Sequence, residues 1–221
     1  MRMAVAFHGL PRVTNRSSVN KWLEIIDSYK MDVFIHTWAI QEERATIQNT
    51  LLEIFNPKSI KCDMPRNFNI TPDDYERRVF PTVVPHNVFS AHTSFYESMC
   101  LVSNYTDMQG WEYDFVIKGR FDAIPGHLEF DYPSCIVVPV DPLLMMKKYT
   151  WRTYKEVYAI NDLIAIGPQR LMKLYANSCD WIDYFYNVDG LEMCSELMLG
   201  ANLARQHVPV VQRLGIPEIV R

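Results

Sequence analysis

Three apolar runs of the chain end in side chains that could bind an anionic ligand. These are His8, Gly9 and Arg12 after the first run, His36, Thr37 and Trp38 after the second, and Arg120 and Asp122 after the third. A guanidinium donates paired hydrogen bonds to phosphate oxygens, and a glycine turn lets backbone N–H groups approach the same atoms. An indole can stack on a base, and a carboxylate can bind a divalent cation. Together these residue types favour a nucleoside diphosphate over an apolar ligand.

The runs that carry these clusters have the pattern of an α/β sheet. Residues 3–8 are apolar, residues 17–29 place apolar side chains at helical spacing, and residues 31–38 form a β-branched run. Strand, helix and strand at this spacing predict a right-handed unit with two parallel strands. Ligands of parallel sheets bind beyond the carboxyl ends of the strands. We therefore expect the three clusters along one edge of the sheet.

The rest of the chain predicts further helices and strands of the same domain. Helices are expected at 41–55, from an N-cap at Ser90, at about 168–186 and at 190–205, and strands within EYDFVIK, CIVVPV, DLIAIG and VPVVQ. Residues 56–88 are irregular and are expected to form a long surface excursion. The predicted fold class is α/β, with a mostly parallel central sheet flanked by helices.

Composition and charge exclude several classes of function. The 22 Lys and Arg residues against 26 Asp and Glu give a net charge of −4, so no overall basic field would attract nucleic acid. No apolar run is long enough to span a membrane. The five cysteines form no C-x-x-C pair, which predicts free thiols in a reducing compartment. No G-x-G-x-x-G follows the first strand, which disfavours a dehydrogenase or a methyltransferase.

Four motifs in order carry a resemblance to a known family. AFHGLPR, DVFIHTW, YDFVIKGRFD and NDLIAIG are similar to motifs of small GT-A-fold glycosyltransferases found in bacterial surface-polysaccharide loci and in large algal DNA viruses. The resemblance implies one GT-A-like domain over residues 1–221, with a Rossmann-like nucleotide-sugar-binding half at 1–125 and an acceptor-binding half at 126–221. It also fits one module of a longer protein. The implied location is the cytoplasm, that of the host if the protein is viral.

The same resemblance implies an activity and a donor site. The enzyme would transfer a hexosyl, deoxyhexosyl or pentosyl group from a nucleoside-diphosphate sugar, expected to be UDP-linked, to a glycan or glycoprotein. The implied donor-binding residues are His8, Gly9, Arg12, His36, Thr37, Trp38, Arg120 and Asp122. Asp122 would also bind Mn²⁺ or Mg²⁺, although Arg120 stands where the family's D-x-D motif has its first aspartate. The alternatives are a structural histidine at His8, a core aromatic at Trp38 and a simple Arg120–Asp122 ion pair.

Two carboxylates are candidates for the base that an inverting transfer needs to take a proton from the acceptor hydroxyl. Asp162 precedes a predicted strand, and Glu196 lies near the start of a predicted helix, with Glu192 expected on the same helical face. A retaining enzyme would need neither as a base. The alternative function is a noncatalytic module that only binds a nucleotide or a glycan.

Overall fold

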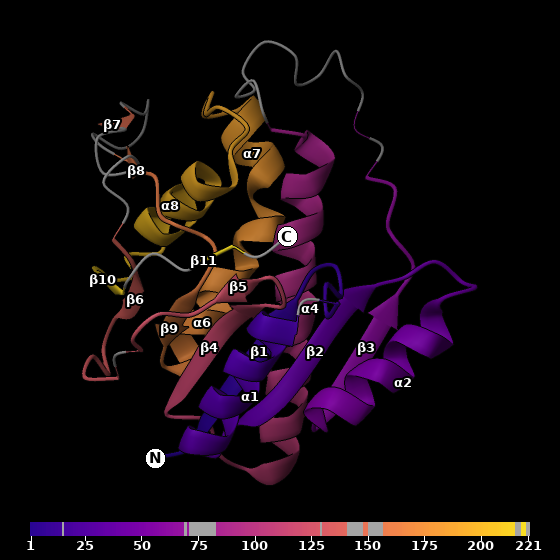
Figure 1. The fold of residues 1–221 in the computed structure, drawn as a ribbon. Helices are drawn as coiled ribbons and strands as arrows, with labels where there is room; N and C mark the ends of the chain where they lie inside the picture. The colour runs from indigo at the N-terminus through magenta and orange to yellow at the C-terminus, as the bar shows by residue number, and fades with distance from the viewer. Residues whose placement is uncertain are drawn as a thin grey trace.

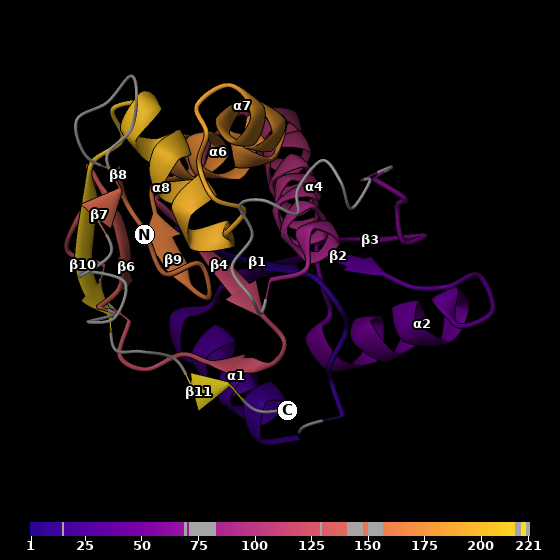
Figure 2. The same cartoon turned by 90° about the horizontal axis from the view of Figure 1, so that it is seen from above.

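The central feature of the computed structural model is a mixed sheet of seven strands in the order β10-β6-β9-β4-β1-β2-β3 (Figure 1). The structure describes residues 1–14, 16–68, 70, 83–128, 130–140, 148–149, 157–214 and 218–219. Helices α1 and α2 lie on one face of the sheet, and α4, α6 and α8 lie on the other (Figure 2). The predicted α/β class with a mostly parallel sheet flanked by helices is thus confirmed.

The elements have the following bounds. The strands of the sheet are β1 (Met3–His8), β2 (Asp32–Trp38), β3 (Ser59–Asp63), β4 (Phe115–Arg120), β6 (Ile136–Pro139), β9 (Ala165–Gly167) and β10 (Val210–Leu214). Two short pairs lie outside it: β5 (Ala123–Ile124) with β11 (Glu218–Ile219), and β7 (Lys148–Tyr149) with β8 (Val157–Tyr158). The helices are α1 (Arg16–Tyr29), α2 (Arg44–Phe55), α4 (Pro85–Gln109), α6 (Gln169–Ala176), the 3₁₀ helix η2 (Asn177–Asp180), α7 (Ile182–Asn187) and α8 (Ser195–Arg205).

The pairing of the central strand β1 determines which strands end at the same edge of the sheet. It pairs in parallel with both β2 and β4, so that Val5 lies opposite Val33 on one side and Ile117 on the other. The carboxyl ends of β1, β2 and β4 therefore share one edge of the sheet, as the sequence predicts. Because β9 runs antiparallel to β4, the residues that precede β9 reach this edge as well.

Each face of β1 packs on a different helical layer. The Phe7 ring lies 4.9 Å from the Trp22 ring of α1 and 5.0 Å from the Phe121 ring, measured between centroids. On the opposite face Ala4 and Ala6 are small, and they share an apolar cluster with residues of α4 such as Phe95. The alternation of large and small side chains along β1 thus lets α4 approach the sheet closely.

Trp22 also fixes the segment that follows β4. Its indole Nε1 donates hydrogen bonds to the carbonyl oxygens of Arg120, at 3.0 Å, and Ala123, at 2.8 Å. The indole is fully buried, so these two bonds satisfy the only polar atom of the side chain. They hold the backbone on both sides of Asp122 against α1.

Several predicted boundaries are wrong. Helix α4 begins at Pro85, so Ser90 lies inside it and is not an N-cap; proline at the first helical position has the backbone angle that a helix start needs. The expected irregular stretch 56–88 contains β3. The helix expected at 168–186 is divided by η2, and the one expected at 190–205 begins only at Ser195. Glu192 therefore lies outside the helix and shares no helical face with Glu196.

No described helix combines the length and the apolar composition that a membrane span requires. Helix α4 has 25 residues, but polar side chains occur along its whole length.

Replacing Gly119 of β4 with alanine is expected to destabilise the fold by about 1–3 kcal/mol. An added Cβ would lie 3.0 Å from two ring carbons of Phe7 and 3.0 Å from a methyl carbon of Val5. Both neighbours are fully buried, so the ring cannot turn away into solvent. Urea unfolding measures the effect. An unchanged midpoint for Gly119→Ala would contradict close packing between β1 and β4.

Candidate functional site

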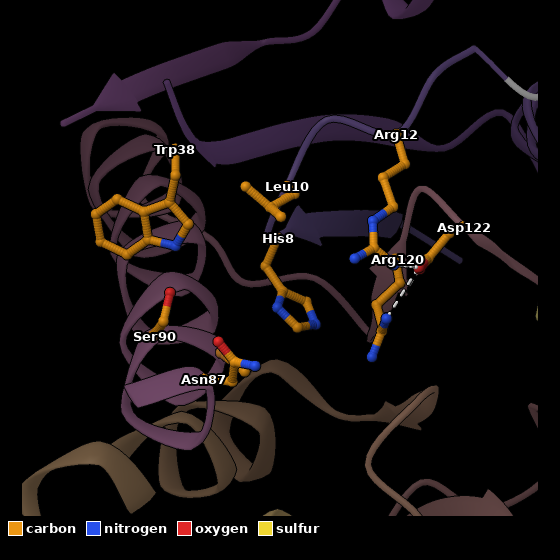
Figure 3. A pocket seen from close by; sticks show the side chains of 10 residues that line it. His8, Leu10, Arg12, Trp38, Asn87, Ser90, Arg120 and Asp122 are labelled. Carbon is orange, nitrogen blue, oxygen red and sulfur yellow. Dashed lines mark hydrogen bonds and ion pairs between the residues drawn. The ribbon is translucent and has the colours of Figure 1, made fainter. Parts of the chain in front are cut away.

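A cavity of about 680 Å³ opens at the carboxyl ends of β1, β2 and β4 (Figure 3). Its lining comprises His8, Gly9, Leu10, Arg12, Trp38, Asn87, Ser90, Ala91, Arg120 and Asp122. Six of the eight predicted donor-binding residues are therefore brought together, and His36 and Thr37 are not in the lining. The first turns of α4 supply Asn87, Ser90 and Ala91, which the sequence did not indicate as site residues.

Two arginines, Arg12 in the loop after β1 and Arg120 at the end of β4, meet on one carboxylate at the cavity wall. Arg12 Nη1 lies 2.5 Å from Asp122 Oδ2. Arg120 donates from Nε to Oδ1 at 2.9 Å and from Nη2 to Oδ2 at 3.0 Å, which is a bidentate pair. The Asp122 side chain is 4% exposed, whereas that of Arg12 is 48% exposed. Burial acts to raise the pKa of Asp122, but the two guanidiniums outweigh it, so the pKa is lowered and the carboxylate stays ionised.

This arrangement carries a net positive charge, because two guanidiniums share one carboxylate. A guanidinium has five N–H donors, and the contacts to Asp122 use only some of those on Arg12 and Arg120. Both side chains also line the cavity. The pair can therefore donate to an anion that enters it.

The Mn²⁺ or Mg²⁺ that the resemblance implies at Asp122 does not fit these contacts. A hard cation needs oxygen lone pairs, and both oxygens of this carboxylate already accept from arginines. Like unit charges 4 Å apart repel by about 4 kcal/mol at an effective dielectric constant of 20, so two guanidiniums oppose a divalent ion beside them. In the part of the chain that the structure describes, no three His, Cys, Asp or Glu side chains are grouped for a metal. Metal binding at Asp122 stays a prediction.

His8 lines the cavity, and both of its ring nitrogens are buried without a hydrogen-bond partner among the described residues. The residue as a whole is 4% exposed. Figure 3 shows its ring between Asn87 and Arg120. Burial lowers the pKa of His8 well below its usual value, and the charges of Lys118 and Arg120 lower it further, so the ring is neutral at pH 7. A neutral imidazole offers a ligand one donor and one acceptor.

Trp38 also lines the cavity and carries a buried N–H group. Its side chain is buried, and Nε1 has no hydrogen-bond partner in the described part of the chain. The His36 ring packs edge-on against it, with centroids 4.7 Å apart, and the Arg66 guanidinium lies 5.9 Å from its centroid. An unsatisfied buried N–H costs about 1–3 kcal/mol, which a polar ligand group or a water molecule would offset. Trp38 is therefore both a packed aromatic and a wall of the cavity.

His36 and Thr37 support the cavity from behind. Thr37 Oγ1 donates to the carbonyl oxygen of Gly9 at 2.8 Å, and the Gly9 amide donates to Ser94 Oγ at 2.8 Å. His36 Nδ1 lies 2.8 Å from Ser94 Oγ, and Nε2 lies 3.3 Å from Asp63 Oδ2. Burial lowers the pKa of His36 to about 4, so the ring is neutral. His36 and Thr37 thus hold the Gly9 turn, whose φ of 92° favours glycine, and their contact with a nucleotide sugar stays a prediction.

A buried polar network lies behind the arginine pair. Lys118 Nζ donates to the backbone carbonyl of Asp162 and, at 3.3 Å, to the Tyr175 hydroxyl. Ser195 Oγ donates to Asp162 Oδ2 at 2.5 Å. Burial acts to raise the pKa of Asp162, but the Lys118 charge, the Ser195 hydroxyl and the Arg120 charge outweigh it, so the pKa is lowered. Burial lowers the pKa of Lys118 to about 8.

His92 extends this network into α4. Its Nε2 lies 2.9 Å from Ser195 Oγ, and its Nδ1 lies 2.6 Å from Ser178 Oγ. A neutral ring that donates from Nε2 and accepts at Nδ1 satisfies both contacts, and burial lowers the pKa of His92 to about 4. The network therefore joins β4, α4, η2 and α8 around the Asp162 carboxylate.

The two predicted bases lie close together, outside the cavity lining. Glu196 stands in the first turn of α8, as the sequence predicts, and accepts from the Cys194 thiol at 2.9 Å. Burial raises the pKa of Glu196, and the charge of Asp162 raises it further. Neither Asp162 nor Glu196 is among the residues that line the cavity. Their environments nevertheless separate the two pKa values, as in paired carboxylates that act as acid and base.

Replacing His8 with phenylalanine is expected to keep or raise the stability of the ligand-free protein, by up to about 1 kcal/mol. The change removes two buried nitrogens that have no partner among the described residues and keeps an aromatic ring. The same variant should bind nucleoside diphosphates more weakly, because the cavity loses a donor and an acceptor. Thermal melting with and without UDP measures both effects. His127→Phe on the surface is the control, and a lower melting temperature for ligand-free His8→Phe alone would contradict the expectation.

The fold and the cavity define a class: an α/β protein whose mixed, mostly parallel sheet has a polar cavity at the carboxyl ends of its strands. Compared with known proteins, the chain matches no protein-family model and no curated protein. The residues around the cavity are therefore the basis for a proposed function.

Proposed function

We propose that the chain is a glycosyltransferase that transfers a sugar from a nucleoside-diphosphate sugar, expected to be UDP-linked, to a glycan or glycoprotein acceptor. One observation carries the proposal. Arg12 and Arg120 lie far apart in sequence, and both contact Asp122 at the edge of the sheet where α/β proteins bind ligands. Both arginines line a cavity together with His8 and Trp38, whose buried ring nitrogens have no hydrogen-bond partner among the described residues. These groups suit a ligand with phosphates at one end and a polar ring at the other.

The chemistry follows from the charges at the cavity wall. In glycosyl transfer the bond to the diphosphate breaks, and negative charge grows on the leaving oxygen while the sugar becomes oxocarbenium-like. Arg12 and Arg120 would stabilise that charge by hydrogen bonds that strengthen as it develops. Asp122 holds their orientation before the ligand arrives, so little reorganisation is needed.

The acceptor proton would go to one of the two partly buried carboxylates, Asp162 or Glu196. Asp162 accepts from Ser195 and lies beside Lys118, which keeps it ionised. Burial and the charge of Asp162 raise the pKa of Glu196, which makes its carboxylate a better proton acceptor. Both stay candidates, and transfer with retention of configuration would need neither as a base.

A noncatalytic nucleotide-binding module is the second candidate. It is favoured by one observation, which is that neither proposed base lines the cavity in the described residues. Such a module would use Arg12, Arg120, His8 and Trp38 in the same way and would leave the glycosidic bond intact.

A melting-temperature screen with UDP, GDP, CDP, ADP and dTDP tests the shared binding step, because a ligand of the folded state raises the melting temperature. We expect at least one nucleotide to raise it. A donor-hydrolysis assay with the matching nucleotide sugars then separates the two candidates. Release of free sugar supports the transferase, and tight binding without release across the panel supports the binding module. No response to any nucleotide would exclude both.

A further inference from the structure

We infer that Asp122 is a positioning residue: it holds Arg12 and Arg120 against the diphosphate, which is bound without a divalent cation. The inference rests on the proposed function, because it concerns how that site holds its ligand. It reverses the role that the sequence motif implies for this aspartate.

The contacts of Asp122 are those of an arginine partner. Three hydrogen bonds of 2.5, 2.9 and 3.0 Å reach its two oxygens, so neither oxygen is left without a guanidinium. A carboxylate that coordinates a cation must direct at least one oxygen at that ion. Three hydrogen bonds leave about one lone pair of this carboxylate free, on a side chain that is 4% exposed. A cation would have to use that lone pair or displace an arginine, and in either case a guanidinium would stand beside the ion with the same sign of charge.

The other nearby carboxylates are also occupied. Asp162 accepts from Ser195 and balances the charge of Lys118. Glu196 accepts from the Cys194 thiol, and its pKa is raised by burial. Asp122, Asp162 and Glu196 thus each already accept a hydrogen bond from a side chain, so a cation at the arginine pair would have to compete with these donors.

The two guanidiniums of Arg12 and Arg120 supply the positive charge that a divalent cation would otherwise place beside the diphosphate. Each guanidinium is a fixed positive charge with donors in a plane, and such a fork matches the oxygens of a phosphate. Arg12 follows the end of β1, and Arg120 ends the neighbouring strand β4, so the two approach the ligand from adjacent strands. Two guanidiniums can thus contact the two phosphates of one diphosphate.

The surrounding backbone keeps this pair in place. Trp22 donates to the carbonyls of Arg120 and Ala123, on either side of Asp122. The strand pair β5–β11 begins directly after Asp122, with Ala123 opposite Ile219. A carboxylate held on both sides can orient two flexible side chains at a small loss of entropy when the ligand binds.

Calorimetric titration of the wild-type chain with UDP and with inorganic pyrophosphate, in EDTA and in Mn²⁺, tests the inference. We expect the two conditions to give dissociation constants that agree within about threefold. Binding that is more than about tenfold tighter in Mn²⁺, or that occurs only in Mn²⁺, would overturn the inference and leave the proposed function standing. No binding of any nucleoside diphosphate in either condition would overturn the proposed function itself.

Two variants separate a positioning role from a metal-ligand role. Asp122→Asn should change the dissociation constant of pyrophosphate by the same factor in EDTA and in Mn²⁺. If Asp122 were a metal ligand, the variant would change this constant in Mn²⁺ alone, and that result would overturn the inference. Arg12→Ala is the second variant, and we expect it to fold because the Arg12 side chain is 48% exposed and Arg120 still contacts Asp122. It should weaken pyrophosphate binding in EDTA by about tenfold. Arg170→Ala, exposed on α6, is the control for the loss of one positive charge.

Discussion

Arg120→Ala is expected to weaken the binding of UDP and pyrophosphate by about 10- to 100-fold. A hydrogen bond between charged groups contributes about 1.5–3 kcal/mol, and every 1.4 kcal/mol changes the dissociation constant tenfold. The variant also loses the bidentate contact to Asp122, so that of the two guanidiniums the carboxylate keeps that of Arg12 alone. Calorimetric titration of the purified variant with pyrophosphate measures the loss.

The same variant should be less stable, by about 1–3 kcal/mol at pH 7, because a nearly buried carboxylate loses its principal partner. Arg120 and Arg12 lower the folded-state pKa of Asp122, so their stabilisation is present above the unfolded-state pKa and is lost as the pH falls through the folded-state value. The difference between wild type and variant should therefore be largest near neutral pH and should shrink in acid. Urea unfolding at pH 7 and at acid pH checks the sign.

A conservative variant and a remote one complete this comparison. Arg120→Lys keeps the charge and loses the planar fork, so we expect it to recover part of the stability and less of the pyrophosphate affinity. Arg170→Ala should match the wild type in both measurements, since its side chain is exposed on α6. Wild-type pyrophosphate affinity in Arg120→Ala would show that Arg120 serves Asp122 alone and does not contact the ligand.

The meeting of Arg12 with Asp122 could be predicted from the sequence. Apolar runs, a helix between the first two of them, and the rule that parallel strands end at one edge are sufficient to place both residues there. The contribution of α4 could not be predicted in the same way. Asn87 and Ser90 look like ordinary polar residues, and the start of their helix at Pro85 follows a stretch without clear periodicity.

The network behind the arginine pair was missed for a different reason. It depends on three side chains from separate elements, Lys118, His92 and Ser195, which show no common pattern in sequence. One signal was present: in FVIKGR the alternation of a strand places Lys118 on the same face as Val116, within an apolar run. A lysine on a buried strand face needs a partner, and this could have directed attention to Asp162.

Lys118→Met is expected to lower the free energy of unfolding by about 3 kcal/mol, because the partly buried Asp162 carboxylate loses the cation that stabilises its ionised form most. Lys118 is 5% exposed, and its Nζ lies 5.2 Å from the Tyr175 ring centroid, so water cannot easily take its place. The pKa of Asp162 should then rise in the folded state. A carboxylate whose pKa is raised by folding destabilises the folded state more as the pH rises, because its ionised form is favoured in the unfolded chain. The difference in free energy of unfolding between wild type and Lys118→Met should therefore be larger at pH 8 than at pH 5.

The double variant Lys118→Met, Asp162→Asn decides whether this loss comes from an unbalanced charge. It removes both charges and keeps an oxygen that can accept from Ser195, so most of the lost stability should return. If the losses of unfolding free energy in the two single variants instead add in the double variant, the loss in Lys118→Met comes from lost packing against Phe95 and Tyr175. The charge of Asp162 is then balanced by other groups. A stable double variant also isolates the chemistry of Asp162. It should retain pyrophosphate affinity, because Arg12 and Arg120 are unchanged, and any loss of sugar transfer would then belong to the catalytic step.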